Sequence, residues 1–260
     1  MFQYIRLPNI RGLGLAFFFL YASVALAQQA LPARPSPTTS QFTLPKHIQV
    51  SYEVTRNGKP FANVYEQFVV TGNTYKIESV TKGLGLYALF GDRKLTSTGE
   101  LTEAGLRPHH FELHQGDNAK KSLIADFDWI SKTLHMLVKG SLNDVSLPPD
   151  TQDLASYAYQ FMFLPTPFKD SITVNLTTGK RLNKYPYKIN ADQELVVIGD
   201  ANAASAQYKT LHLQLDSAKP QVESKELWLA AEHYYLPIRI LMVDESGSKI
   251  EQTLTELHVE

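Results

Sequence analysis

Most of the chain after residue 45 alternates apolar and polar residues with a period of two. In residues 48–55, for example, the even positions are apolar and the odd positions are polar. Short turns that contain Gly, Asn, Asp or Pro separate such segments, as at Asn57-Gly58. Alternation predicts half-buried strands, and turns of hairpin length predict that neighbouring strands pair antiparallel.

This pattern predicts about 13 or 14 strands between residue 46 and the C-terminus. Twist accumulates across so many strands, and open edges invite aggregation, so such a sheet tends to curl. We therefore expect a mainly β protein, with a single curved antiparallel sheet forming a barrel or half-barrel and one main amphipathic helix. The pattern leaves open whether the barrel closes, and whether its interior is filled or holds an apolar ligand.

One segment has a helical period instead. Five apolar residues after Asp150 follow the spacing i, i+3, i+4, i+7 and i+8, which places them on one helical face. We expect Asp150 to be the N-cap, Asp153 to lie in the first turn, and the polar face with Gln152 and Gln160 to meet solvent. The five apolar residues are Leu154, Tyr157, Ala158, Phe161 and Met162.

The strongest hairpin pattern lies in residues 227–242, where two apolar runs flank a short polar turn. Trp228 is expected to anchor the core from this hairpin. Arg239 lies on an otherwise apolar strand, where Arg commonly pairs with a carboxylate or binds an anionic ligand. We favour an ion pair with Glu226 across the hairpin, and the alternative is an acidic head group of a ligand.

Residues 83–91 form an apolar segment between glycines that fits neither the strand period nor a full helix. One interpretation is a short connector whose Leu84, Leu86, Tyr87 and Phe90 plug one end of the core. The alternative is a loop that covers a cavity.

The N-terminus has the pattern of a cleavable secretory signal over residues 1–27, with two arginines, an apolar run and small residues before Gln28. Its apolar core of about 13 residues is short of the roughly 20 that a membrane span needs; an uncleaved anchor is the alternative. Residues 28–45 are Pro-rich and predict a flexible leader, and residues 46–260 a single β-rich domain. We expect an exported periplasmic protein with no transmembrane segment after cleavage.

Composition excludes several functions. The chain has no cysteine, which excludes a lipoprotein acyl anchor, thiol catalysis and thiolate metal sites. Its 25 basic and 26 acidic residues are scattered, so no footprint for nucleic acid is present. Motifs for Ser hydrolases, zinc proteases, phosphate-binding loops and dinucleotide binding are missing. We therefore expect no enzyme and no cofactor.

The best remnant of an enzymatic site is His109, His110 and His114 with the acids Asp126 and Asp128 on a following strand. Imidazole nitrogens and carboxylate oxygens are ligands that zinc accepts. Histidines on the surface of a strand are more often solvated polar positions, which we favour over a metal site.

Six short motifs occur in an order that resembles the DUF3108 family of exported bacterial proteins, whose members have no established biochemical role. The resemblance implies a β-rich periplasmic protein. The last two motifs also resemble hairpins of the LolA- and LolB-like lipoprotein carriers, which implies a curved sheet that holds acyl chains under a helical lid. The motifs are Tyr52-Glu-Val54 leading to Gly58, Gly105-Leu-Arg-Pro108 followed by Phe111, Phe127-Asp-Trp129, Asp153-Leu-Ala-Ser-Tyr157, Leu227-Trp-Leu229 and Leu236-Pro-Ile-Arg239.

The favoured hypothesis is a non-enzymatic binding or carrier protein for a lipid or other apolar small molecule. A scaffold or interaction module of the cell envelope with a filled core and a protein partner is the alternative, and a metal-dependent hydrolase is least favoured. The candidate ligand-binding residues are Leu84, Leu86, Tyr87, Phe90, Tyr157, Phe161, Trp228 and Arg239.

Overall fold

The structure, a computed structural model, describes residues 44–116, 122–165, 167–198, 206–217 and 224–260. The predicted signal peptide and residues 28–43 of the predicted leader lie outside the described residues. The last leader residue, Pro45, is buried, and strand β1 begins two residues later at His47.

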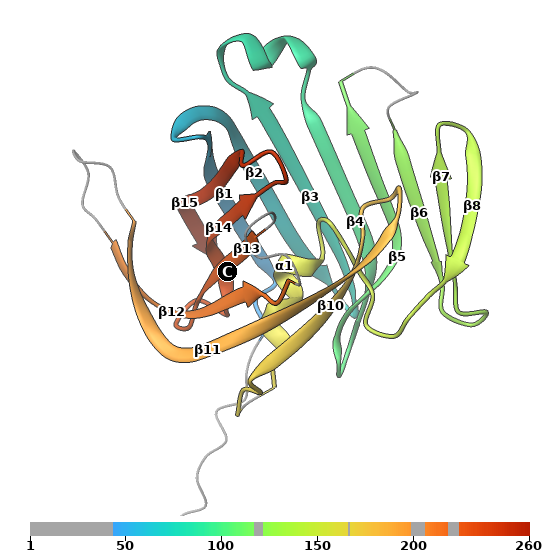
Figure 1. Cartoon of the computed structure of the whole chain (residues 1–260). Coiled ribbons are helices and arrows are strands. Elements are labelled where there is room, and N and C mark those ends of the chain that lie inside the picture. Colours follow the sequence, from blue (N-terminus) through green and yellow to red (C-terminus); the bar gives the residue numbers. More distant parts are fainter. Residues whose placement is uncertain (1–43, 117–121, 166, 199–205, 218–223) are drawn as a thin grey trace, which may run out of the picture. The chain divides into compact units, whose positions relative to one another are not determined.

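The described residues form one 15-stranded sheet in the order β8-β7-β6-β5-β4-β3-β2-β1-β15-β14-β13-β12-β11-β10-β9 (Figure 1). The strands are β1 (His47–Arg56), β2 (Lys59–Thr71), β3 (Thr74–Gly83), β4 (Arg93–Thr102), β5 (Gly105–Gln115), β6 (Leu123–Asp128), β7 (Thr133–Val138), β8 (Ser141–Ser146), β9 (Gln152–Asp153), β10 (Ser171–Thr177), β11 (Leu182–Ile198), β12 (Ala206–Leu215), β13 (Ser224–Ala230), β14 (Leu236–Val243) and β15 (Lys249–Val259). The helices are η1 (Gly85–Phe90), α1 (Tyr157–Gln160) and η3 (Phe161–Phe163).

The sheet consists of two meanders that meet where β1 pairs with β15. All neighbouring strands are antiparallel except β9 and β10, which are parallel. The prediction of a mainly β protein with one curved antiparallel sheet is confirmed, and the sheet does not close into a barrel.

The strand count differs from the prediction at three places. β8 was missed because five of its six residues are exposed and show no apolar alternation. β9 has only two residues, which is too short for any periodic signal. Residues 182–198, which the alternation divides into two segments, form the single strand β11, whose pairing with β12 shifts between Asn190 and Glu194.

The sheet curls until its edge strand β9 lies against β5, in the middle of the other meander. The Gln152 side chain on β9 donates from Nε2 to the Leu106 carbonyl on β5 at 2.9 Å. Strands β6, β7 and β8 continue past this contact, so the two sheet edges do not pair. The result is an open curved sheet with α1 against its inner face (Figure 1).

The predicted N-terminus of the helix is wrong. Asp150 lies in a turn with φ 58°, and Gln152, expected to face solvent, is 1% exposed because it lies in strand β9. The N-cap is Ser156, and Asp153 stabilises the turn before it: the Asp153 Oδ1 accepts hydrogen bonds from the backbone N–H groups of Ala155 at 2.8 Å and Ser156 at 2.9 Å. Ser156 Oγ accepts from the Asp153 N–H at 2.9 Å, so the two residues hydrogen-bond reciprocally across this turn.

Gln160 ties the end of α1 to the turn between β4 and β5 instead of pointing into solvent. Its Oε1 accepts from the Leu106 N–H at 2.7 Å, and its Nε2 donates to the Ala104 carbonyl at 2.9 Å. Gly105 makes this approach possible, because a Cβ at that position would lie 2.4 Å from Gln160 Oε1.

Aromatic side chains fill the interior around the helix. Tyr159 is 1% exposed and stacks on Phe68 of β2 with ring centroids 5.1 Å apart. Phe161 is 2% exposed and packs with residues of β10 to β14, including Leu213 and Leu227. Burying rings of this size is a large apolar contribution to stability, so the helix acts as the central plug of the core.

A buried carboxylate joins this plug to the opposite wall. Asp153 is fully buried, and its Oδ2 accepts a 2.6 Å hydrogen bond from Ser97 Oγ on β4. The Tyr75 hydroxyl lies 3.2 Å from the same Ser97 Oγ. Burial raises the pKa of Asp153 to about 6, even though its hydrogen bonds favour the charged form.

Because its pKa is raised in the folded state, Asp153 should make the free energy of unfolding decrease as the pH rises. Between pH 4 and 6 the folded state binds more protons at this group than the unfolded state, so raising the pH lowers the free energy of unfolding. In Asp153→Asn this titration is absent. We expect the stability of the wild type relative to Asp153→Asn to fall by up to about 3 kcal/mol between pH 4 and pH 7, measured by urea denaturation. A difference that is constant with pH would contradict this assignment.

Candidate binding site

The short helix η1 exposes a group of large apolar side chains. Leu86 is 80% exposed, Leu89 83% and Phe90 65%, and η1 contains no buried residue. The interpretation in which Leu86, Tyr87 and Phe90 plug the core is therefore wrong; Leu84, which precedes η1, is half-buried. Tyr87 is 40% exposed and contacts Phe61 edge to face at 4.4 Å.

The backbone of η1 is fixed by close packing at both of its ends. A Cβ at Gly83 would lie 2.5 Å from the Tyr87 carbonyl group, and one at Gly91 would lie 2.8 Å from Gly116 Cα. The Leu84 N–H donates to the Phe61 carbonyl at 2.9 Å, and Gln115 Nε2 donates to the Phe90 carbonyl at 3.2 Å. The apolar side chains thus project from a rigid support.

A hollow of about 790 Å³ lies beside this support, and Leu89 and Phe90 form its apolar side. Lys94 and His114, which are directly opposite each other on β4 and β5, line its polar side together with Ser122 and the acid Asp92. In the described part of the chain Lys94 has no ion-pair partner. An apolar edge beside a free ammonium group suits an amphiphilic ligand with an anionic head.

Hydrogen bonds hold His114 in place at this hollow. Its Nε2 lies 2.9 Å from Glu112 Oε2, and its Nδ1 lies 2.8 Å from Ser122 Oγ. The other oxygen of Glu112 lies 2.9 Å from His110 Nε2, while His110 Nδ1 lies 2.6 Å from Asp126 Oδ1. The result is one chain of hydrogen bonds along the outer face of β5 and β6.

The charges in this chain stabilise one another. Partial burial disfavours the charged form of His110, but hydrogen bonds to Asp126 and Glu112 outweigh it and raise the pKa of His110. Hydrogen bonds from His114 and His110 lower the pKa of Glu112. No group of three or more His, Asp or Glu residues in the described segments has the geometry to hold a metal ion.

Trp228 and Arg239 are directly opposite each other on β13 and β14, and Trp228 is 5% exposed and belongs to the core, as expected. The Arg239 guanidinium lies 4.6 Å from the centroid of the Trp228 ring, and His212 also stacks on this ring at 4.6 Å. Arg239 Nε donates to Glu251 Oε1 on β15 at 2.7 Å. The expectation of an ion pair is correct, but its partner is Glu251; Glu226 contacts His212 at 3.0 Å instead.

Tyr157 and Phe161 lie in a third place, on the helical plug. Tyr157 is half-buried, and the Lys225 ammonium lies 4.8 Å from its ring. The predicted ligand-binding residues therefore fall into three separate groups: residues 84–90, Trp228 with Arg239, and Tyr157 with Phe161.

Sequence reasoning missed one inward-facing acid. Glu66 of β2 accepts hydrogen bonds from Ser79 Oγ at 3.0 Å and from the Tyr159 hydroxyl at 3.2 Å. Burial raises its pKa, although both hydrogen bonds favour the charged form. The sequence did indicate this placement, because Glu66 lies between Val64 and Phe68 on the inward-facing positions of the alternating strand.

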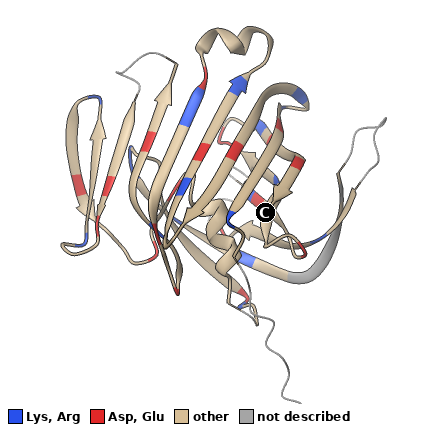
Figure 2. Ribbon diagram, turned by 180° about the vertical axis from the view of Figure 1, so that it is seen from behind, with Lys and Arg blue, Asp and Glu red and all other residues tan. Residues whose placement is uncertain are grey.

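Charges of both signs are spread over the strands, as Figure 2 shows. None of the helices in the described residues is long and apolar enough to cross a bilayer. The hollow beside η1 differs from the surrounding surface in its exposed apolar side chains, and it does not lie in a cluster of like charges.

A family model described as a protein of unknown function, DUF3108, matches residues 48–255. Among solved structures, a β-barrel-like protein of the DUF1849 domain of unknown function from Brucella abortus is similar, with 10% identity, a TM-score of 0.52, and coverage of 84% of this chain and 99% of that chain. At 10% identity, this similarity supports a common fold and says nothing about function.

A second similar structure is a domain assigned to outer membrane lipoprotein sorting from Vibrio parahaemolyticus, with 9% identity and coverage of 82% of this chain and 85% of that chain. Its TM-score of 0.24 is too low to support an argument about this chain. None of the curated proteins matches.

The pair of Arg239 with Trp228 and Glu251 should contribute to stability. Arg239→Met removes the cation from the ring and leaves Glu251 with Lys249 alone. We expect the free energy of unfolding to fall by about 1–2 kcal/mol, measured by urea denaturation followed by tryptophan emission. The matched variant Lys249→Met removes the exposed partner of the same carboxylate and should cost less than about 0.5 kcal/mol. Equal losses in the two variants would contradict this ranking.

Proposed function

The chain belongs to the DUF3108 family, whose function is unknown, and from its geometry we propose that it is a non-enzymatic binding or carrier protein for an apolar or lipid-like ligand. The observation that carries the proposal is the rigid, exposed apolar surface of η1 beside the hollow lined by Lys94 and His114.

Exposed apolar groups of this kind are costly unless something covers them. A single exposed Leu is ordinary, but Leu86, Leu89 and Phe90 are gathered within five residues and are each more than half exposed. The close packing at Gly83 and Gly91 holds these side chains outward instead of letting them collapse onto the sheet. A contiguous apolar surface that the backbone keeps exposed is typical of a contact site for a ligand, partner or membrane.

The surroundings of η1 favour an amphiphile over a purely apolar molecule. Leu89 and Phe90 supply the apolar contact, while Lys94 supplies a charge that has no partner in the described residues. A fatty acid or an anionic lipid would place its chain against η1 and its head group at Lys94 and His114. No group in the proposal has to form or break a covalent bond.

Export is part of the proposal. The pattern of residues 1–27 supports secretion, and the absence of cysteine leaves no site for a lipoprotein acyl anchor. The proposed location is therefore the periplasm, where an amphiphile in transit has to be shielded from water.

The alternative is an interaction module of the cell envelope with a filled core. It is favoured by the aromatic packing of Tyr159, Phe68 and Phe161, which occupies the interior around the helix. In that case η1 would contact an envelope protein rather than a lipid.

Binding of a fluorescent fatty acid tests the proposal. We expect 11-(dansylamino)undecanoic acid to bind the mature protein one to one, with a blue shift of dansyl emission. Leu86→Ser, Leu89→Ser and Phe90→Ser together should weaken binding at least about tenfold, because they remove the apolar contact. Lys94→Met should weaken binding of the acid but not of an uncharged alcohol with the same dansyl group and chain.

The matched control replaces exposed apolar residues elsewhere. Ile130 is 97% and Leu142 67% exposed, so Ile130→Ser with Leu142→Ser should leave binding unchanged. All variants should unfold within a few degrees of the wild type, since they change exposed side chains. A folded wild type that shows no saturable binding, or a control that loses as much affinity as the η1 variant, would refute the proposal.

A further inference from the structure

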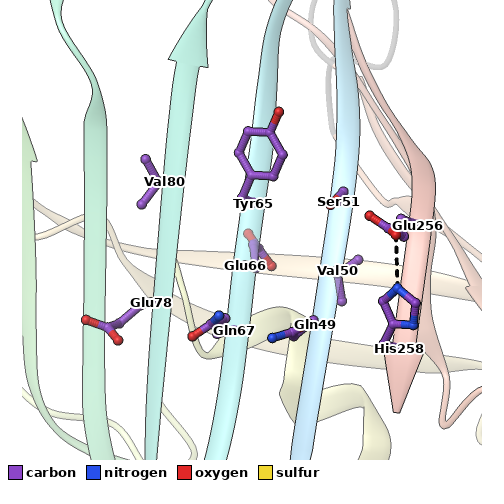
Figure 3. A pocket seen from close by; sticks show the side chains of 10 residues that line it. All are labelled: Gln49, Val50, Ser51, Tyr65, Glu66, Gln67, Glu78, Val80, Glu256 and His258. Atoms are coloured by element: carbon purple, nitrogen blue, oxygen red, sulfur yellow. Dashed lines mark hydrogen bonds and ion pairs between the residues drawn. The ribbon is translucent and has the colours of Figure 1, made fainter.

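A second hollow of about 500 Å³ lies on the outer face of four adjacent strands, β15, β1, β2 and β3 (Figure 3). Most of its lining side chains lie on the outer face, whereas Val50 and Glu66 face the interior, where the Tyr159 hydroxyl of α1 donates to Glu66. The hollow does not include any residue of η1, so a ligand bound here would be independent of the proposed carrier function.

The strand register places one row of hydrogen-bonding side chains directly across all four strands. His258 pairs with Gln49, Gln49 with Gln67, and Gln67 with Glu78. Neighbouring strands are about 4.8 Å apart, so the row presents polar groups at regular intervals over roughly 14 Å. It contains both donors and acceptors, and its two central members are planar amides.

A second row runs parallel to the first, two residues further along each strand. Glu256 pairs with Ser51, Ser51 with Tyr65, and Tyr65 with Val80. The small Ser51 between larger neighbours forms the floor, which explains why the surface is hollow there. Tyr65 is 47% exposed, so its ring forms one side of the hollow.

The carboxylates at the two ends of the hollow already have partners. Glu78 pairs with Lys76 at 2.9 Å, and Glu256 with His258 at 2.9 Å. In the centre, by contrast, the Gln49, Ser51 and Gln67 side chains make no hydrogen bond to any described residue. The central groups left without a hydrogen bond are thus neutral amides and a hydroxyl, and they lie beside the Tyr65 ring, whose centroid is 5.8 Å from the Lys82 ammonium.

These free groups select one class of ligand. A cationic peptide would need unpaired carboxylates, and an anion would need unpaired cations. A purely apolar molecule would leave the two amides without hydrogen bonds, which is costly. A chain of sugar rings satisfies all the groups, because its hydroxyls bond to amides and its C–H faces pack on an aromatic ring.

From this arrangement we propose that the outer face of β15, β1, β2 and β3 is an oligosaccharide-binding site. The sugar chain lies across the strands, along the row of His258, Gln49, Gln67 and Glu78. One ring packs against Tyr65 over the floor formed by Ser51. The site is non-catalytic, because recognition uses hydrogen bonds and ring packing alone.

Isothermal titration of the mature protein with three uncharged tetrasaccharides tests the site: cellotetraose, maltotetraose and tetra-N-acetylchitotetraose. We expect saturable one-to-one binding of at least one of them. Tyr65→Ala and Gln67→Ala should each weaken that binding about tenfold, whereas Tyr65→Phe, which keeps the ring, should stay within about threefold. The control Asn63→Ala changes the same face of β2 outside the hollow and should have no effect.

Three results would overturn the inference. They are a folded wild type that binds none of the tetrasaccharides, binding that Tyr65→Ala and Gln67→Ala leave unchanged, and a site that takes tetralysine in place of sugars. Because the η1 residues are untouched in all of these variants, binding of the dansyl fatty acid reports separately on the carrier function.

Discussion

The hydrogen bonds of Asp153 connect parts of the chain that the meander alone would leave apart. This buried carboxylate holds the turn that leads into the short helix through the N–H groups of residues 155 and 156, and it accepts from Ser97 on β4. Strand β9, which carries it, is the edge of the sheet, while β4 lies in the middle of the other meander. An unpaired carboxylate in this position would be strongly destabilising, so the curl of the sheet depends on these bonds being made.

Several other features depend on this connection. With β9 held against β5, the helix lies against the inner face, where Tyr159 and Phe161 fill the interior. A filled interior leaves the outer face and the rim as the places for ligands. The two hollows, one beside η1 and one over Ser51, both lie there. The open curved sheet therefore presents both hollows at its surface.

The sequence predicted the sheet well because alternation reports directly on a two-faced strand, as in β1 and β5. It failed where structure came from contacts between distant residues. Asp150 and Asp153 both precede an apolar helical pattern, and the pattern does not contain the bond of Asp153 to Ser97, more than 50 residues earlier, which holds Asp153 in the core. Arg239 was likewise assigned to Glu226 within its hairpin, whereas its partner lies on β15, a strand placed by the fold.

The candidate site was predicted only in part, for a similar reason. The glycines of residues 83–91 marked an irregular apolar segment, but the close approaches of Gly83 to Tyr87 and of Gly91 to Gly116 decide that its side chains face outward. Lys94 and His114 carry no motif and become neighbours through the β4–β5 register. The rows of the outer face depend on several strand registers at once, which no local pattern contains.

We propose that this protein carries an amphiphilic molecule in its native compartment. Native mass spectrometry of the exported protein, purified from the periplasm without detergent, tests it most directly. We predict a one-to-one adduct with the mass of a fatty acid or lipid, lost in the variant with Leu86→Ser, Leu89→Ser and Phe90→Ser. A folded protein that shows only its own mass, before and after incubation with extracted envelope lipids, would contradict the claim.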